Sequence, residues 1–196
     1  FKRGSVDMDL LRSWGVPIFV GVLIGTGLAS YVRGEVLTGV FAVVALFVSA
    51  NMALKPDGWT VTDRLPTGAT RIGLGGFIGG FSAMMGIGGG TLSVPILSAC
   101  SYPIRRAVGT ASAIGLIIAI PGTIGFIASG IGVADRPFGS IGYTNMVGFA
   151  LIVPATILSA PYGAKIAHTI STGGLRKAFA LFLFLTSLRM IYSLVT

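Results

Sequence analysis

The sequence predicts an all-α polytopic membrane protein of inverted repeats, each repeat being a glycine-broken re-entrant helical hairpin followed by three transmembrane helices. Three observations support this fold class. The 196-residue chain is 53% hydrophobic and only 10% charged, a balance that a soluble domain does not need. Its apolar residues form long stretches separated by short basic segments. The longest uncharged stretch, residues 72–104, contains too many glycines to be one straight helix.

The formal net charge of +8 does not indicate nucleic-acid binding. The basic residues lie between apolar stretches, which is typical of topology determinants and of contacts with lipid headgroups. The chain has one cysteine, one histidine and six scattered acidic residues. We therefore expect no cofactor, no metal site and no nucleophile–base pair, so the protein is not predicted to be an enzyme.

The elements follow in order along the chain. Residues 1–56 are predicted to hold the last two transmembrane helices of the first repeat, in the apolar stretches 16–32 and 36–54. Residues 57–71 are polar, with a proline and an Asp-Gly pair, and predict a cytoplasmic linker. Residues 72–196 are expected to form a complete second repeat. Its parts are the hairpin at 72–104 and transmembrane helices at 107–129, 143–165 and 175–195.

The hairpin is predicted from the length and the composition of its stretch. As a single helix the stretch would be ~50 Å long at ~1.5 Å per residue, against a bilayer core of ~30 Å. Residues 86–90 read GIGGG and cannot hold a stable helix, and Pro95 removes a further backbone donor. Irregular backbone inside a membrane is tolerated where it packs in protein or lines a wet cavity. The turn at 86–90 is therefore the candidate substrate site.

The distribution of Lys and Arg favours the hairpin over a straight crossing. If every apolar stretch crossed the membrane, the two sides would hold seven and six basic residues. If the hairpin returns to its own side, the distribution becomes eleven against two, with Arg189 left inside a helix. Only the second arrangement has the cytoplasmic excess of basic residues that membrane proteins normally show.

A weak internal repeat supports the inverted arrangement. Residues 46–52 (LFVSANM) parallel residues 184–190 (FLTSLRM) at an offset of 138 positions. A hairpin plus three crossings is an odd number of spans, so successive copies would be inverted, as in many secondary transporters. The same offset places the partner of Gly88 before Phe1. We therefore expect the chain to be N-terminally truncated and to carry only the end of its first repeat.

The predicted chemistry is anion binding by free backbone amides. The second half-helix would begin near Thr91, and its N–H groups and partial positive dipole form an anion site. Thr91 and Ser93 add hydroxyl donors. The predicted substrate-binding residues are Gly86, Gly88, Gly89, Gly90, Thr91, Ser93, Pro95, Thr110, Ser112, Asn51 and Arg189.

Several of these residues have a structural alternative. Glycines also permit close helix packing, to which we assign the pairs Gly75/Gly79 and Gly76/Gly80. The hydroxyls of Thr110 and Ser112 could bond to neighbouring backbone instead of substrate. Arg189 could extend to the membrane surface instead of facing a cavity.

The glycine motif and two later segments carry a family resemblance. Residues 80–90 (GFSAMMGIGGG), Pro95 and residues 107–112 (AVGTAS) resemble the TauE/SafE sulfite exporter family of membrane permeases. The resemblance implies a transporter of small sulfur-containing anions, such as sulfite or organosulfonates. Family members are usually longer and have a glycine motif in each half, and the first copy is missing from this sequence.

Together these features predict a multi-pass permease of the cell (inner) membrane. Its partners would be a small anionic substrate and the lipid bilayer, and the oligomeric state is left open between a monomer and a homo-oligomer. No Asp or Glu lies deep in a predicted span, so the usual carboxylate proton relay is missing from these spans. We therefore expect export, which needs no such coupling, because each negative charge that leaves a negative-inside cell gains ~2.3 kcal/mol per 100 mV. The alternatives are a permease for another small solute and a non-transporting membrane subunit.

Overall fold

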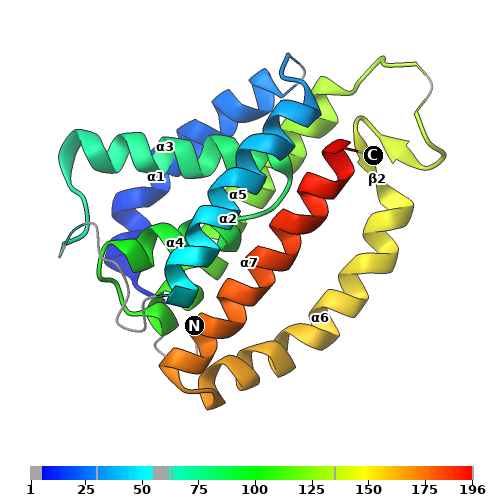
Figure 1. Cartoon of the computed structure of the whole chain (residues 1–196). Coiled ribbons are helices and arrows are strands. Elements are labelled where there is room, and N and C mark those ends of the chain that lie inside the picture. The colour runs from blue at the N-terminus through cyan, green and yellow to red at the C-terminus, as the bar shows by residue number, and fades with distance from the viewer. Residues whose placement is uncertain (1–5, 30, 55–61, 63, 135, 196) are drawn as a thin grey trace.

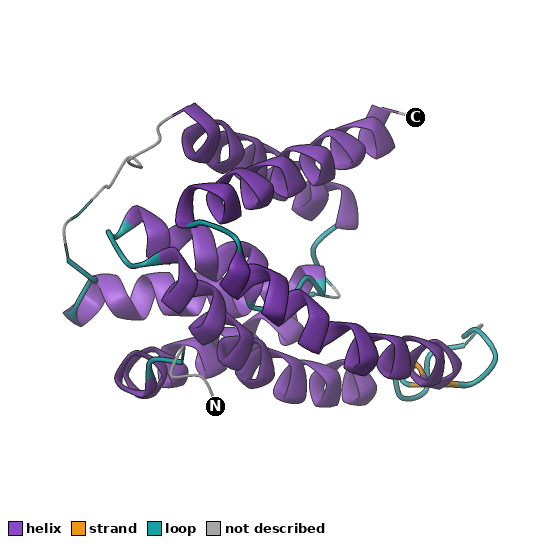
Figure 2. Ribbon diagram, turned by 90° about the horizontal axis from the view of Figure 1, so that it is seen from below, coloured by secondary structure: helices purple, strands orange, loops and turns teal. Residues whose placement is uncertain are grey.

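The computed structural model describes residues 6–29, 31–54, 62, 64–134 and 136–195. Helices dominate this part of the chain, and the only strands in it form one short hairpin (Figures 1 and 2). The elements in chain order are α1 (Met8–Leu28), α2 (Gly34–Leu54), α3 (Gly68–Met85), α4 (Gly90–Ala99), α5 (Ile104–Ser129), β1 (Ser140–Ile141), β2 (Thr144–Asn145), α6 (Met146–Thr169) and α7 (Thr172–Val195).

Five of the described helices are long and apolar enough to cross a membrane: α1, α2, α5, α6 and α7. Helices α3 and α4, which flank the glycine run, are not among them. The prediction of an all-α polytopic membrane protein is confirmed.

The helices form two groups. Helix α1 packs against α3 and α5, and α4 packs against α5. Trp14, Ile18 and Val22 of α1 lie in the core of this first group. Helices α2 and α7 pack closely against each other and touch the first group over a smaller area. Helix α6 lies at the outside of the molecule, and its membrane-length segment is 0% buried (Figure 1).

Some helix boundaries differ from the predicted ones for local reasons. Helix α1 begins eight residues before the stretch 16–32, because the Asp7 carboxylate caps it by accepting the N–H groups of Asp9 and Leu10 (3.1 and 3.0 Å). Helix α6 begins at Met146 and not at residue 143, because residues 140–145 form the β hairpin. Helix α3 begins inside the predicted linker 57–71, of which residues 57–61 and 63 lie outside the described residues.

The glycine run interrupts the helix and the chain turns back. Helix α3 ends at Met85, and the N–H groups of Gly86 and Ile87 bond to the carbonyls of Ala83 and Ser82 (3.1 and 3.2 Å). This is the pattern of a helix closed by a left-handed glycine. After α4, the Ser101 hydroxyl donates to the Thr62 carbonyl (3.0 Å). The segments before α3 and after α4 therefore lie side by side (Figure 1).

Other contacts gather the predicted cytoplasmic loops at the same end of the bundle. The Tyr102 hydroxyl donates to the Asp7 carboxylate (2.7 Å), and Arg105 donates to the Ile170 carbonyl (2.7 Å). These contacts join the start of α1, the segment between α4 and α5, and the segment between α6 and α7. We call this end, together with the start of α7, the basic end.

The helices that the internal repeat makes equivalent, α2 and α7, run antiparallel (Figure 1). Ser49 and Ser187, which are 138 positions apart, are both buried. The Ser49 hydroxyl donates to the Ala180 carbonyl (2.8 Å). An antiparallel pair with buried serines at equivalent positions agrees with an inverted repeat, which itself stays a prediction.

Candidate functional site

The candidate site is the break between α3 and α4. The first backbone bond of α4 runs from the Ser93 N–H to the Gly89 carbonyl (3.1 Å). The N–H groups of Gly90, Thr91 and Leu92 precede it and have no acceptor within the helix. Because these amides point along the axis of a ten-residue helix, the start of α4 carries a partial positive charge.

The glycines of the break have different roles. A Cβ atom on Gly89 would lie 2.7 Å from the Gly115 nitrogen, so Gly89 is needed for close packing against α5. Gly86 and Gly88 have φ angles of +63° and +78°, which L-residues with side chains rarely adopt. The positions of their missing Cβ atoms face open space, as does that of Gly90. Packing therefore explains Gly89, and backbone conformation explains Gly86 and Gly88.

The glycines earlier in α3 fit the packing interpretation. A Cβ atom on Gly79 would overlap the Ile18 carbonyl oxygen of α1. Gly21 and Gly25 of α1 meet the backbone of Gly76 and Gly80 in the same way. The assignment of the two glycine pairs to helix packing is confirmed.

The two faces of α4 have different surroundings. Thr91 and Pro95 line a cavity of about 230 Å³, whose other walls come from α2, α3 and α7. Ser93 is two residues from Thr91 and points to another side of the helix. It is fully buried, and its hydroxyl has no hydrogen-bond partner. The structure thus separates the two hydroxyls that the sequence predicted would act together.

A second, smaller cavity of about 80 Å³ lies at the basic end of α4. It is lined by Phe47, Val48, Asn51, Met52, Pro95, Ser98, Ala99 and Arg176. Asn51 and Pro95 are predicted site residues that the fold brings together, whereas Ser98 and Arg176 were missed. The spacing of Ser98 could have revealed it, because positions 91, 95 and 98 share one helix face.

Three predicted residues lie away from the break. Thr110 is buried, and its hydroxyl accepts the Asp7 N–H (3.0 Å). The Ser112 hydroxyl donates to the Val108 carbonyl (3.0 Å) and is exposed. Arg189 is exposed on α7 and lines neither cavity beside α4. These contacts favour the structural alternatives for Thr110 and Ser112, and a binding role for any of the three stays a prediction.

Asp7 and Tyr102 form a polar contact at the basic end that the sequence did not suggest. The N–H of Leu10 and the Tyr102 hydroxyl lower the pKa of Asp7 below its usual 3.8. Burial, and the hydrogen bond to Asp7, raise the pKa of Tyr102 to about 12. Within the described residues, no three His, Cys, Asp or Glu side chains lie close enough to hold a metal ion.

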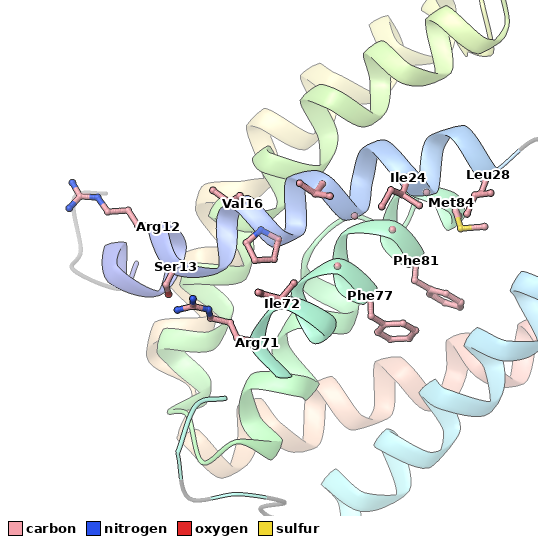
Figure 3. A pocket seen from close by; sticks show the side chains of 16 residues that line it. Arg12, Ser13, Val16, Ile24, Leu28, Arg71, Ile72, Phe77, Phe81 and Met84 are labelled. Carbon is pink, nitrogen blue, oxygen red and sulfur yellow. The ribbon is translucent and has the colours of Figure 1, made fainter. Parts of the chain in front are cut away.

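An open groove of about 830 Å³ follows α1 and α3 on the outside of the first group (Figure 3). Arg12, Ser13 and Arg71 lie at one end of it, and Ile24 and Met84 lie toward the other. Its floor is formed by the glycines of the α1–α3 contact. Apolar walls of this kind are typical of a surface that faces lipid or another helix.

Two known proteins with similar sequences are both named as probable membrane transporters. A "Probable membrane transporter protein" of Haemophilus influenzae is 28% identical over 189 residues, which is 96% of this chain and 72% of that protein. A similarly named protein of Methanocaldococcus jannaschii is 26% identical over 172 residues, which is 84% of this chain and 63% of that protein. The chain is thus shorter than both relatives. No solved structure gives a significant match.

The family model described as "Sulfite exporter TauE/SafE" matches residues 1–190. This range includes the helix break, both cavities beside α4, four of the helices that can cross a membrane and all but the last residues of the fifth, α7. The match confirms the resemblance seen in the glycine motif. The chain therefore belongs to the sulfite exporter TauE/SafE family of membrane transporters.

Proposed function

We propose that this protein carries a small sulfur oxyanion, sulfite or an organosulfonate, outward across the cell membrane, and that the anion binds at the break between α3 and α4. The observation that carries the proposal is the start of α4. Three backbone amides without a helix acceptor lie there, next to glycines whose surroundings are open. In an apolar bundle, such amides need a polar partner.

The chemistry of the break suits an oxyanion better than a cation. Backbone N–H groups and the helix dipole attract negative charge without a basic side chain. Thr91, whose side chain carries a hydroxyl donor, is among the residues that line the neighbouring apolar cavity. The description of the matching family supplies the sulfur chemistry, since both relatives are named only as transporters.

The two helix groups suggest how the site opens to each side in turn. Gly89 holds the start of α4 against α5, so the break moves with the first group. Both cavities lie on the side of α4 that faces α2 and α7, away from its contact with α5. A rocking of the α2–α7 pair against the first group would open and close this space, as in other transporters with broken helices.

The direct test is anion flux in proteoliposomes. We expect protein-dependent efflux of sulfite and methanesulfonate, compared with chloride and glycerol. Equal movement of all four solutes, or faster movement of glycerol, would favour a permease for another solute. No flux above that of empty liposomes would favour a non-transporting subunit.

Substitutions at the break link flux to the site. Gly88→Ala strains a left-handed residue by roughly 1–2 kcal/mol, so we expect slower sulfite efflux. Gly73→Ala is the matched control, because its Cβ position is also open, its φ angle is not in the left-handed region and it lies outside the break. Equal flux in the two variants would argue against a role for the conformation of the turn.

Topology is tested by labelling single cysteines at Thr62 and Ser101 in a Cys100→Ala background. A re-entrant hairpin places both positions on the same face of the membrane, as their hydrogen bond suggests. Labelling from opposite faces would mean that the stretch crosses the bilayer, and the proposed site would then be wrong.

A further inference from the structure

The open groove along α1 and α3 is positively charged at one end and apolar along the rest of its length (Figure 3). Arg12 and Arg71 lie where both helices begin, at the basic end of the bundle. Every fourth residue of α1 from this point lines the groove: Arg12, Val16, Val20, Ile24 and Leu28. Residues four positions apart share one face of a helix, so α1 presents an apolar stripe that begins with a cation.

The positive charge at this end has no acidic partner in the groove. Among the described residues that line the groove, none is acidic. The Asp7 carboxylate at the start of α1 is occupied by the N–H of Leu10 and by the Tyr102 hydroxyl. The Nε atom of Arg71 is buried without a hydrogen-bond partner. Helix α3 also has no side-chain cap, so the positive end of its dipole adds to the charge of the arginines.

The dimensions of the groove suit a lipid chain. From Arg12 to Leu28 the groove follows α1 for ~24 Å at ~1.5 Å per residue, and one leaflet accounts for ~15 Å of a ~30 Å hydrocarbon core. An acyl chain that begins at the arginines therefore has an apolar wall along its whole length. The rings of Phe77 and Phe81, stacked with centroids 5.3 Å apart, form part of this wall.

Charge complementarity favours a lipid over another helix as the occupant. A helix in the groove would have to bring an acidic side chain to the two arginines, and charged residues are rare in membrane-spanning helices. A phospholipid brings a phosphate at the membrane surface together with an acyl chain. The positive-inside rule places a basic end at the cytoplasmic face, where anionic lipids give the leaflet a negative surface potential.

We propose that the groove binds one anionic phospholipid, with its phosphate at Arg12 and Arg71 and an acyl chain along Val16, Val20 and Ile24 (Figure 3). The lipid bridges α1 and α3 on the outside of their glycine contact. This inference goes beyond the proposed transport function, and it does not depend on which solute the protein carries.

The test measures the binding of phosphatidylglycerol and of phosphatidylcholine with the same acyl chains to the detergent-purified protein, by native mass spectrometry. One basic side chain near an anionic headgroup contributes about fivefold in affinity. We therefore expect phosphatidylglycerol to bind about tenfold or more tightly than phosphatidylcholine. Arg12→Gln and Arg71→Gln should each weaken phosphatidylglycerol binding about fivefold and leave phosphatidylcholine binding unchanged. Arg71→Lys keeps the charge and should keep most of the affinity.

Matched controls separate the groove from the rest of the surface. Lys177→Gln removes an exposed charge at the same end of the bundle but outside the groove, so it should leave the lipid selectivity unchanged. Val20→Trp fills the apolar part of the groove and should weaken the binding of both lipids. Phe19→Trp introduces the same ring at an exposed neighbour that does not line the groove, and it should have no effect.

The inference is wrong if the arginine variants bind phosphatidylglycerol within twofold of Lys177→Gln, or if the unmodified protein binds both lipids equally. It is also wrong if inorganic phosphate alone raises the melting temperature as much as phosphatidylglycerol does, because the arginines would then bind free phosphate. A lipid-free dimer that Val20→Trp dissociates would show that the groove is an interface between two copies. Weaker phosphatidylglycerol binding in both arginine variants, with normal binding in Phe19→Trp, would support the lipid site.

Discussion

The contact between α1 and α3 and the contact between α4 and the α2–α7 pair differ in almost every respect. The first is a direct backbone contact, in which glycines of one helix meet carbonyl groups of the other and leave no room for a methyl group. The second contains two cavities, of about 230 and 80 Å³, and a buried hydroxyl without a partner. Both contacts are made by the same glycine-rich stretch.

The difference gives two sides of one stretch very different packing. Close helix packing stabilises membrane proteins mainly through van der Waals contact, which small residues permit. Empty space sacrifices that contact. The rocking that we propose requires an interface that can separate, and it would use the loosely packed side of α4. The predictions below test this contrast, beginning with the largest expected effect.

Gly79→Val should be the most damaging substitution in the tight contact. A valine side chain at this position would overlap the Ile18 carbonyl, which is backbone and cannot move away. We expect a loss of about 3 kcal/mol or more, the upper end for overpacking, seen as a lower melting temperature in detergent. Gly73→Ala is the control, since nothing lies within 4 Å of its Cβ position. Equal melting temperatures would contradict the tight contact.

Thr110→Val should come second, because it leaves the Asp7 N–H without its acceptor at the contact of α1 with α5. An orphaned backbone donor costs about 1–3 kcal/mol. Ser112→Ala removes only an exposed hydroxyl bonded within its own helix, so it should change stability by less than about 0.5 kcal/mol. Thermal unfolding of both variants in the same detergent checks this order.

Val48→Phe tests the loose contact, because Val48 lines both cavities beside α4. The larger ring can enter empty space, so we expect a stability change of at most about 1 kcal/mol, with sulfite efflux reduced several-fold. Val43→Phe is the control on the exposed face of α2. A strongly destabilised Val48→Phe protein would show that the space beside Val48 is too small for the larger side chain, and would contradict the loose contact.

The smallest effect is expected for the Asp7–Tyr102 contact, which ties α1 to the segment after α4. The pKa of Asp7 is lowered from 3.8 in the fold, first by the Leu10 N–H of the helix cap and then by the Tyr102 hydroxyl, so the contribution of the Asp7 carboxylate is present above pH 3.8 and is lost as the pH falls through the lower folded value. The pKa of Tyr102 is raised from 10.0 to about 12, so its contribution is present below pH 10 and is lost as the pH rises through 12.

We expect Asp7→Asn to reduce the loss of stability in acid, by at most about 1 kcal/mol because the pair is partly exposed. Tyr102→Phe should act on the same contact and therefore add little to Asp7→Asn. Melting temperatures from pH 3 to pH 8 measure this. An unchanged acid profile in both variants would show that the contact contributes nothing.

The sequence was informative where composition and periodicity decide the structure. Uninterrupted apolar stretches predicted the membrane helices, and the impossibility of a helix through residues 86–90 predicted the break at Gly86. The role of Gly79 followed from its spacing. These features depend on residues that are close together in the sequence, so they can be predicted without knowledge of the tertiary contacts.

The sequence was less informative where distant segments meet. Arg176 was counted only as a topology marker, because nothing near it indicates that α2 and α4 complete its surroundings. For Thr110 the sequence left open a bond to substrate or to neighbouring backbone, and nothing near it indicated the backbone of Asp7, 103 positions away, whose N–H its hydroxyl accepts. The β hairpin at residues 140–145 also escaped prediction, since it is too short to show an alternating pattern.

The length of α4 has an electrical consequence. A ten-residue helix is ~15 Å long, about half of a ~30 Å hydrocarbon layer. If the hairpin is re-entrant, an ion at the first amides of α4 has traversed roughly half of the membrane field, so each elementary charge would feel ~1.2 kcal/mol per 100 mV. Occupancy of the break should then depend on voltage, with an electrical distance near one half.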